Sequence, residues 1–331
     1  MEIRELDPRD ETLVHRHWDI GRTAEGASRP YDFYVPWETA WLTYANGRED
    51  IEMVLLGAFE DDEMWGAARV DHSVHDNLHS ASADFYVHPD RQRRGIGRAL
   101  VAAGEEVARG RGRRLLMIEA FSPPAEESPG LLFARAVGFR DAIEDRIKVV
   151  DLFETEPTWA ELERRIAPRC QDYRIVTWRD RVPEELVEDY CRLNEMFFEE
   201  APMGELDIER EKWDAARVSQ QTERNRRTGR RVLAAGAVAP DGTLVGLTEA
   251  MTNERAAWRG LQSGTLVDPQ HRGHALGLAT KLANHRQFRA VFPDCRVLMT
   301  GNAGVNAAMN AVNDALGYRE TERCVELQKD I

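Results

Sequence analysis

Two stretches of the sequence combine basic residues, glycine and the expected start of a helix, and this combination suits the binding of a phosphate group. The first stretch runs from Asp84 to Val101 and the second from Thr265 to Ala279. Each reads as an apolar strand, a turn with proline, a basic loop with glycine, and a helix rich in alanine and leucine. Glycine lets an anion approach the backbone closely, and the first turn of a helix presents unpaired N–H groups. Both stretches therefore predict a site for a diphosphate.

The spacing inside the loops differs from the commonest phosphate-binding motifs. Neither stretch contains the G-x-G-x-x-G of dinucleotide-binding folds or the G-x-x-x-x-G-K-[ST] of P-loops. The first reads Q-x-x-G-x-G from Gln92 to Gly97, and the second reads Q-x-x-G-x-A from Gln270 to Ala275. The two glutamines are 178 residues apart, which predicts a repeat of about one domain.

The elements around the two loops follow the same order in both halves of the chain. A pair of strands precedes each motif strand, and one apolar strand follows the helix after it. The expected strands are 51–59, 64–70 and 115–118 in the first half, and 232–238, 243–252 and 296–300 in the second.

Both stretches resemble motif A of the GNAT acyl-CoA N-acyltransferases, written [R/Q]-x-x-G-x-[G/A]. The resemblance implies an α/β (α+β) fold with two tandem domains, each a mixed, partly splayed β-sheet flanked by helices. It implies acetyl-CoA as the acyl donor, with its pyrophosphate on the loop amides and its pantetheine along the motif strand. Residues matched in this way are Tyr86, Val87, Gln92, Arg93, Arg94, Gly95, Ile96, Gly97 and Arg98 in the first copy, and Leu266, Val267, His271, Arg272, Gly273, His274, Ala275, Leu276 and Gly277 in the second.

A later block of the same family, x-x-Y-x-x-x-G-F, carries a tyrosine that serves as general acid for the departing CoA thiolate. This chain has Ala134 at that place in the first half and Asn313 in the second. The resemblance therefore puts independent catalysis by the first half in doubt and makes Asn313 a candidate in the second. It also assigns Asn306 to CoA binding, with a helix cap as the alternative role, because asparagine favours such positions.

Attack of an amine on a thioester needs a base that takes a proton from the acceptor ammonium. Glu249 is our candidate, and its alternative role is that of an exposed carboxylate on a strand. Asp71 and Asp84 are weaker candidates in the first half. We therefore expect the second half to be the catalyst and the first to be a CoA-binding or structural partner.

The aromatic stretch 31–44 has two possible roles. It carries six aromatic residues, and these could form a packing surface between helices or the wall of an acceptor pocket. Aromatic clusters more often belong to cores than to sites, so we favour packing.

Length and charge set the remaining expectations. The 331 residues favour two domains, which we place at 1–154 and 172–331 with a charged linker at 155–171. The formal net charge of −14 argues against nucleic acid or an anionic membrane surface as a partner. The four cysteines are scattered and show no disulfide or metal spacing, and the N-terminus is charged. We expect a cytoplasmic protein without a metal, as a monomer or homodimer.

Taken with the resemblance, the sequence predicts an acetyl-CoA-dependent N-acetyltransferase. Its expected acceptor is a primary amine of a small molecule, such as an amino sugar, a polyamine or an antibiotic, which attacks directly in a ternary complex. Three alternatives remain at this point: a catalytically degenerate CoA-binding or scaffold protein, acetylation of a protein amine, and aminoacyl transfer from tRNA. The acidic net charge disfavours the last of these.

Overall fold

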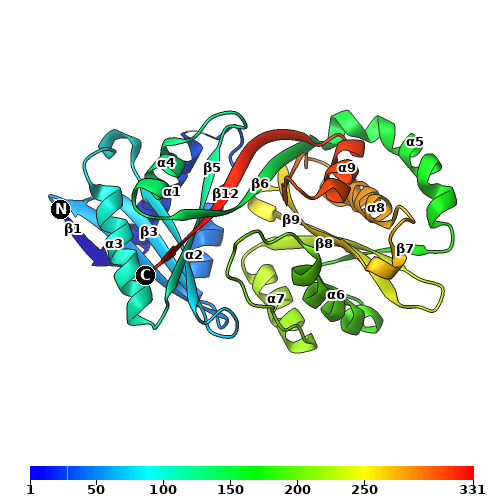
Figure 1. Cartoon of the computed structure of the whole chain (residues 1–331), viewed down its shortest axis with the longest axis horizontal. Helices are drawn as coiled ribbons and strands as arrows, with labels where there is room; N and C mark the ends of the chain where they lie inside the picture. Colours follow the sequence, from blue (N-terminus) through cyan, green and yellow to red (C-terminus); the bar gives the residue numbers. More distant parts are fainter. Residues whose placement is uncertain (28) are drawn as a thin grey trace. The chain divides into compact units, whose positions relative to one another are not determined.

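The chain forms two compact units, and each is assembled from separate stretches of sequence (Figure 1). The computed structural model describes residues 1–27 and 29–331, with the backbone alone at Phe198. Unit 1 consists of Met1–Asp145, Gly204–Glu209 and Glu322–Ile331. Unit 2 consists of Arg146–Met203 and Arg210–Thr321. Each unit holds a mixed sheet flanked by helices, which confirms the predicted fold class.

The sheet of unit 1 has the strand order β1-β2-β3-β4-β5-β12. Its neighbouring strands are antiparallel, except that β4 and β5 are parallel. The elements of unit 1 are β1 (Glu2–Glu5), α1 (Glu11–Gly26), α2 (Trp37–Asn46), β2 (Ile51–Glu60), β3 (Glu63–Ser73), β4 (Ser80–Val87), α3 (Ile96–Gly110), β5 (Leu115–Ser122), α4 (Pro129–Ala136), the start of β6 (Arg140–Asp151) and most of β12 (Arg319–Asp330).

Strand β2 shows how the two faces of this sheet are covered. Its buried part is a continuous apolar run, because helices cover both of its faces. Leu55 packs in one cluster with Ile20 of α1, whereas Val54 and Leu56 pack in another cluster with Ile96 of α3. Helices α1 and α2 therefore cover one face, which we call the α1 face, and α3 covers the other.

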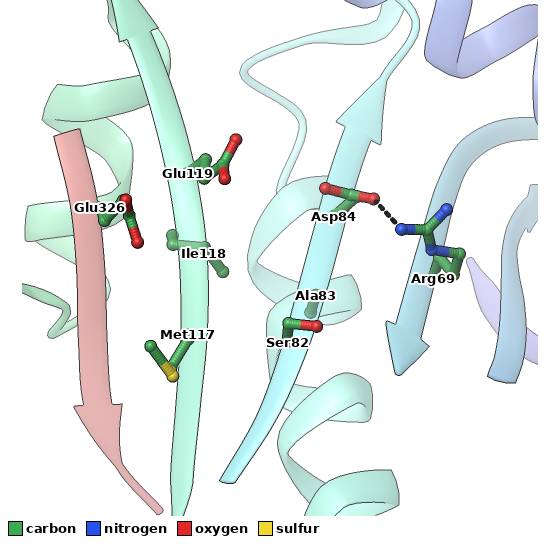
Figure 2. Close-up of a pocket in the computed structure, with 8 residues that line it drawn as sticks. All are labelled: Arg69, Ser82, Ala83, Asp84, Met117, Ile118, Glu119 and Glu326. Atoms are coloured by element: carbon green, nitrogen blue, oxygen red, sulfur yellow. Dashed lines mark ion pairs between the residues drawn. The ribbon is translucent and has the colours of Figure 1, made fainter. Parts of the chain in front are cut away.

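Strands β4 and β5 separate in the middle of unit 1. Their parallel pairing runs from Ser80 opposite Leu115 to Ser82 opposite Met117, and no pair follows among the described residues. Strand β4 nevertheless continues to Val87 (Figure 2). The predicted splay is therefore present.

The sheet of unit 2 has the order β6-β11-β10-β9-β8-β7, in which β10 and β11 are parallel. The pairs β7–β8, β8–β9 and β9–β10 are antiparallel. The elements of unit 2 are the end of β6, α5 (Leu152–Cys170), β7 (Arg174–Arg179), α6 (Val187–Glu200), α7 (Ala215–Arg227), β8 (Arg230–Val238), β9 (Leu244–Asn253), β10 (Arg259–Val267), α8 (Leu276–Val291), β11 (Val297–Ala303) and α9 (Ala307–Ala315).

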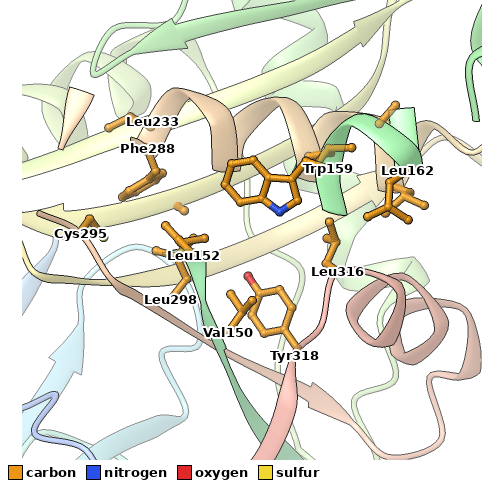
Figure 3. Close-up of a cluster of buried hydrophobic side chains, with 14 of the residues drawn as sticks. Val150, Leu152, Trp159, Leu162, Leu233, Phe288, Cys295, Leu298, Leu316 and Tyr318 are labelled. Carbon is orange, nitrogen blue, oxygen red and sulfur yellow. The ribbon is translucent and has the colours of Figure 1, made fainter. Parts of the chain in front are cut away.

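Helix α5 covers all but the last residue of the stretch 155–171 that the sequence analysis assigned to a linker. Its residues Trp159, Leu162 and Ile166 recur at helical spacing and are buried in the main cluster of unit 2, beside Tyr318 and Phe288 (Figure 3). The charged residues between them led to the linker prediction, and they form the outer face of the helix. The stretch is therefore part of the core of unit 2.

The last strand of the chain completes unit 1. Residues 323–330 of β12 pair with residues 122–115 of β5 in antiparallel register. Conversely, residues 146–151 of β6 belong to unit 2, where β6 is the neighbour of β11. The two units thus differ from the expected domains 1–154 and 172–331. Strand pairing is a long-range choice, and the local pattern of β6 or β12 does not specify it.

Candidate active site

The basic loop of unit 1 lies between the end of β4 and the start of α3. Two of its residues have a left-handed backbone conformation: Arg93 has φ 64° and Gly95, which precedes the helix, has φ 88°. The Gln92 side-chain amide donates a hydrogen bond to the carbonyl of Val87 at 3.4 Å. A side chain at Gly95 would meet no atom within 4 Å, so the loop backbone faces open space. These features fit the backbone cradle that a diphosphate needs.

The loop of unit 2 has the same backbone plan, with different residues. Gly273 has φ 89°, and Ala275, which precedes α8, has φ 57°. The Arg272 guanidinium donates to the carbonyl of Val267 at 3.3 Å. A side chain at Gly273 would also meet no atom within 4 Å.

This geometry corrects the alignment of the two motifs. Ala275 is the counterpart of Gly95 because each is the left-handed residue before its helix, and Arg272 is the counterpart of Gln92. The offset is therefore 180 residues, not 178, and the second motif reads R-x-x-A-x-G from Arg272 to Gly277. Glycine is the usual residue at left-handed positions, so the sequence match aligned Gly273 instead.

The basic side chains of the two loops have different surroundings. Arg93, Arg94 and Arg98 are exposed and make no ion pair with the described residues of the chain. In unit 2, by contrast, Arg272 pairs with Glu200.

Neighbouring side chains support the loop of unit 2. Arg169 of α5 donates to the carbonyl of Gly273 at 2.8 Å. The Tyr173 hydroxyl lies 3.0 Å from Nδ1 of His271, and Nδ1 of His274 lies 3.3 Å from the Arg169 carbonyl. The predicted residues His271, Gly273 and His274 therefore lie together with α5 at the start of α8.

A register shift distinguishes the motif strand of unit 2 from that of unit 1. Pairing of β10 with β9 shifts between Gln262 and Thr265, which leaves Ser263 and Gly264 irregular. Pairing of β4 with β3 keeps one register from Val87 to Ser82. Irregularities of this kind leave a backbone N–H unpaired and often lie beside active sites.

The irregularity lies upstream of the backbone positions assigned from the resemblance. Leu266 and Val267 pair regularly with β9, as Tyr86 and Val87 do with β3. The sequence did carry a signal for the shift, because a glycine inside a strand often marks a bulge, and Gly264 is such a residue.

Glu249 projects from β9 toward α6. The hydroxyl of Tyr190, a buried residue of α6, donates to its two carboxyl oxygens at 3.1 and 3.2 Å. Burial raises the pKa of Glu249 to about 7, and the hydrogen bond from Tyr190 opposes part of that rise. A carboxyl with such a pKa is suited to act as a general base near neutral pH.

The equivalent position of unit 1 holds a cation. In unit 1, Gly66 of β3 pairs with Val87 of β4, and in unit 2, Gly246 of β9 pairs with Val267 of β10. The two glycines are therefore equivalent, and three residues further along each strand Arg69 is the counterpart of Glu249. Arg69 forms ion pairs with Asp71 at 3.1 Å and with Asp84 at 3.2 Å. Both weaker base candidates are therefore tied to a guanidinium.

Asn313 is fully buried on α9 and lies in a chain of hydrogen bonds. The ammonium of Lys281 donates to its Oδ1 at 2.6 Å, and its Nδ2 donates to Asn302 at 2.9 Å. Asn302 in turn donates to Asn310 at 2.9 Å. Burial, followed by the charge of Lys148, lowers the pKa of Lys281 to about 7. Sequence analysis did not select Lys281, because its partner is 32 residues away.

Glu249 and Asn313 are held from opposite faces of the sheet of unit 2. Ala250, next to Glu249 along β9, packs in the cluster of α5 and α8, so Glu249 itself faces α6. Figure 1 shows α6 and α7 on one side of β8 and β9 and α8 on the other. The splay of β10 from β11, after Leu261 opposite Met299, lies between these faces.

Two other predicted features lie outside this chemistry. Asn306 accepts from the backbone N–H of Met309 at 3.1 Å and so caps α9. The aromatic residues of stretch 31–44 pack around α1 and α2, where Trp37 stacks on Trp41 and contacts Trp18.

A cavity of about 280 Å³ lies in unit 1 where β4 and β5 separate (Figure 2). Four charged residues, each from a different strand, line it: Arg69, Asp84, Glu119 and Glu326. Ser82, Ala83, Met117 and Ile118 complete the lining. In the part of the chain that the structure describes, no group of three or more side chains could hold a metal ion. Nor does any described helix have the length and apolar character needed to cross a membrane.

Comparison with known proteins agrees with this architecture. Residues 19–139 match the model of the acetyltransferase (GNAT) family. The chain is similar to the tandem GNAT protein from the clavulanic acid biosynthesis pathway, with 27% identity, 99% of this chain and 98% of that chain covered, and a TM-score of 0.81. It shares the fold of a GCN5-related N-acetyltransferase from Sphaerobacter thermophilus, with 18% identity, 99% of this chain and 95% of that chain covered, and a TM-score of 0.68. A search of curated proteins found no match.

Proposed function

The chain belongs to the GNAT family of acetyltransferases as a tandem of two such domains, and from this premise we propose that unit 2 transfers an acetyl group from acetyl-CoA to a primary amine of a small molecule. One observation carries the assignment to unit 2. Glu249 is a carboxyl with a pKa of about 7 beside the irregular segment of β10, whereas Arg69 holds the same place in unit 1.

The acceptor enters from the α6 face in this proposal. Its ammonium gives a proton to the Glu249 carboxylate, which the Tyr190 hydroxyl holds in place. The freed amine then points through the splay between β10 and β11. Acetyl-CoA supplies the activated acetyl group from the opposite face: the amine forms the amide bond, the thioester C–S bond breaks, and CoA leaves as a thiolate.

The backbone at Ser263 and Gly264 supplies the N–H group for the carbonyl oxygen of the thioester. Because this segment lacks a regular partner on β9, it can donate without breaking a sheet hydrogen bond. The donor is fixed before the reaction, so it costs no reorganisation as negative charge develops.

Asn313 stands where the family pattern has its tyrosine, but its side chain is fully buried and cannot touch the departing thiolate. Lys281 donates to its Oδ1 and its Nδ2 donates to Asn302, so the role we assign to Asn313 is to hold α9 in position beside the site.

Unit 1 binds acetyl-CoA without transferring the acetyl group. Its loop has three exposed arginines without ion-pair partners among the described residues, which favours phosphate binding. It also has Arg69 where unit 2 has the base, and Ala134 where unit 2 has Asn313. A cation cannot accept the proton that acyl transfer releases.

Acetyl-CoA titration by calorimetry tests the assignment on the intact chain and two matched variants. Gly95→Glu and Ala275→Glu each place a carboxylate at the residue before the helix of one loop. We expect the intact chain to bind at two sites and each variant to lose one. Only Ala275→Glu should abolish acetylation of a mixed panel of amines. If transfer survives Ala275→Glu and is lost in Gly95→Glu, unit 1 is the catalyst. If acetyl-CoA binds and no amine is acetylated, the scaffold function replaces the enzyme.

A further inference from the structure

Four apolar side chains form a row across the sheet of unit 2, one from each of four neighbouring strands. Val232 of β8 pairs with Met251 of β9, which pairs in turn with Leu261 of β10. Leu261 also pairs with Met299 of β11. Side chains of paired residues lie on the same face of a sheet, so these four residues form a continuous strip, which we call the apolar row.

The apolar row faces α6, as Glu249 does. Side chains alternate between the two faces along a strand. The residues next to the row on three of its strands pack on the opposite face, in the cluster of α5 and α8: Leu233, Ala250 and Leu298. A side chain at Gly260, the neighbour of Leu261 on the fourth strand, would meet Leu298 at 2.7 Å. The row therefore lies on the side of β8 and β9 where Figure 1 shows α6 and α7.

The apolar row is only partly covered by the rest of the protein. Leu261 is 39% exposed, whereas Leu298 on the opposite face is fully buried. Val232, Met251 and Met299 are each partly exposed. An exposed apolar patch on a protein surface often marks a place where a ligand binds. The two methionines suit this role, because their flexible side chains adapt to apolar groups of different shape.

The row begins close to the proposed base. Met251 follows Glu249 by two residues on β9, so the two side chains share a face and their Cα atoms are roughly 7 Å apart. The pair of Leu261 and Met299 lies where β10 and β11 begin to separate. A substrate with its amine at Glu249 would therefore place its next few carbon atoms over Met251 and Leu261.

An aromatic ring from α6 adds to these surroundings. A side chain at Gly264 of β10 would meet the ring of Phe197 at 3.2 Å, so this ring lies against the irregular segment of the strand. Phe197 follows Tyr190 by seven residues on α6, which places both on the side of the helix that faces the sheet. Beyond the carboxyl of Glu249, an acceptor thus meets aromatic and apolar groups.

We propose that the acceptor of unit 2 is a primary amine with an apolar aliphatic or aromatic group, and that Met251, Leu261 and Met299 select it. The inference rests on the transfer function proposed for unit 2. A second ammonium or a hydroxylated ring over the row would lose hydrogen bonds to water, and the row offers no polar side chain in exchange. Diamines and amino sugars are therefore poorer acceptors than apolar amines of the same length.

Acetyl transfer by the full chain to a matched panel of amines tests this selectivity. The panel consists of ethylamine, pentylamine, 2-phenylethylamine, 1,4-diaminobutane and glucosamine. From ethylamine to pentylamine, kcat/KM should rise about three- to fourfold for each methylene that the row buries. Pentylamine and 1,4-diaminobutane have the same length and differ by a methyl group in place of an ammonium. We expect kcat/KM to be at least about tenfold higher for pentylamine.

Leu261→Asp should change the preference in favour of the diamine, because it places a carboxylate in the row where the second ammonium lies. The ratio of kcat/KM for pentylamine to that for 1,4-diaminobutane should fall at least about tenfold. Leu132→Asp, on α4 of unit 1, is the matched control and should leave the ratio unchanged. Leu132 is 50% exposed and Leu261 39%, so both variants should fold.

Calorimetric titration of the intact chain with CoA present separates this inference from the proposed function. Pentylamine should bind more tightly than 1,4-diaminobutane, and Leu261→Asp should reduce or reverse that difference. If no amine of the panel is acetylated, the proposed function fails, and the order of these affinities decides the inference.

Three results would overturn the inference. The first is a natural chain that prefers 1,4-diaminobutane or glucosamine to pentylamine as substrate and as ligand. The second is a ratio that Leu261→Asp leaves in place, or that Leu132→Asp changes as much. The third is a chain with which none of the apolar amines reacts or binds.

Discussion

Two opposing effects set the pKa of the Glu249 carboxyl, and the pH dependence of the reaction tests both. Burial favours its neutral form, while the hydroxyl of Tyr190 favours its charged form. A base with a pKa of about 7 is active when deprotonated, so kcat/KM should fall as the pH falls below about 7. Glu249→Gln should lower kcat/KM by about 10²- to 10⁴-fold and remove this acid limb.

Tyr190→Phe sharpens the same test. Without the phenol hydrogen bond, the pKa of Glu249 should rise further, and the acid limb should move to higher pH with full activity retained well above it. Tyr31→Phe, in unit 1, is the matched control and should leave the profile in place. An acid limb that persists in Glu249→Gln would mean that another group is the base.

Individual residues also mark the limits of reading this site from sequence. Glu249 and Asn313 were proposed from their positions in the strand and block patterns, and their roles stay predictions. Tyr190 and Lys281 could not be proposed in this way, because each acts on a partner that is distant in the chain, Tyr190 on Glu249 and Lys281 on Asn313. Only the packing of α6 on β9, and of α8 against α9, brings these pairs together.

At the scale of elements, the two basic loops were predictable as strand–loop–helix units, but the residue-by-residue correspondence between them was not. The proline turns and the helices after them identified both loops. The second loop places alanine in a left-handed conformation, at Ala275, where a search for glycine finds Gly273 instead. Backbone conformation decides the correspondence, and residue identity is only a guide to it.

This element-scale difference predicts a reciprocal pair of stability changes. Ala275→Gly should stabilise the protein by about 0.5–1 kcal/mol, because the left-handed region costs an L-residue about 1–2 kcal/mol, offset in part by glycine entropy. Gly95→Ala should destabilise it by about 1 kcal/mol or more for the same reason. Urea denaturation measures both. A loss of stability in Ala275→Gly would contradict the assignment of Ala275 as the counterpart of Gly95.

At the scale of the molecule, each unit depends on residues from the other half of the sequence. Unit 1 is completed by residues 322–331, and a buried ion triad secures them. Arg29 pairs with Glu25 at 2.6 Å and with Glu322 at 3.0 Å, and its side chain is only 6% exposed. The resemblance predicted two tandem domains correctly in kind, but a local pattern cannot reveal which strand joins which sheet.

Arg29→Met should therefore destabilise unit 1 by about 3–5 kcal/mol, because it leaves buried carboxylates without their partner. The exposed pair of Arg140 with Asp330, also on β12, is the matched control. Arg140→Met should change the stability by less than about 1 kcal/mol. Scanning calorimetry can follow both variants. Equal effects would mean that burial of the triad does not matter.

The placement of β12 also orders events on the ribosome. Residues 1–145 emerge first, yet their sheet lacks a strand until residues 322–331 have been made. At typical synthesis rates the intervening segment takes roughly ten to thirty-five seconds. During that time the edge of β5 is open to wrong pairing. Unit 2 ends at Thr321 and so can close before unit 1. The unit whose translation begins first is thus the last to be completed, and a stop codon ahead of residue 322 would leave the sheet formed by residues 1–145 without its last strand.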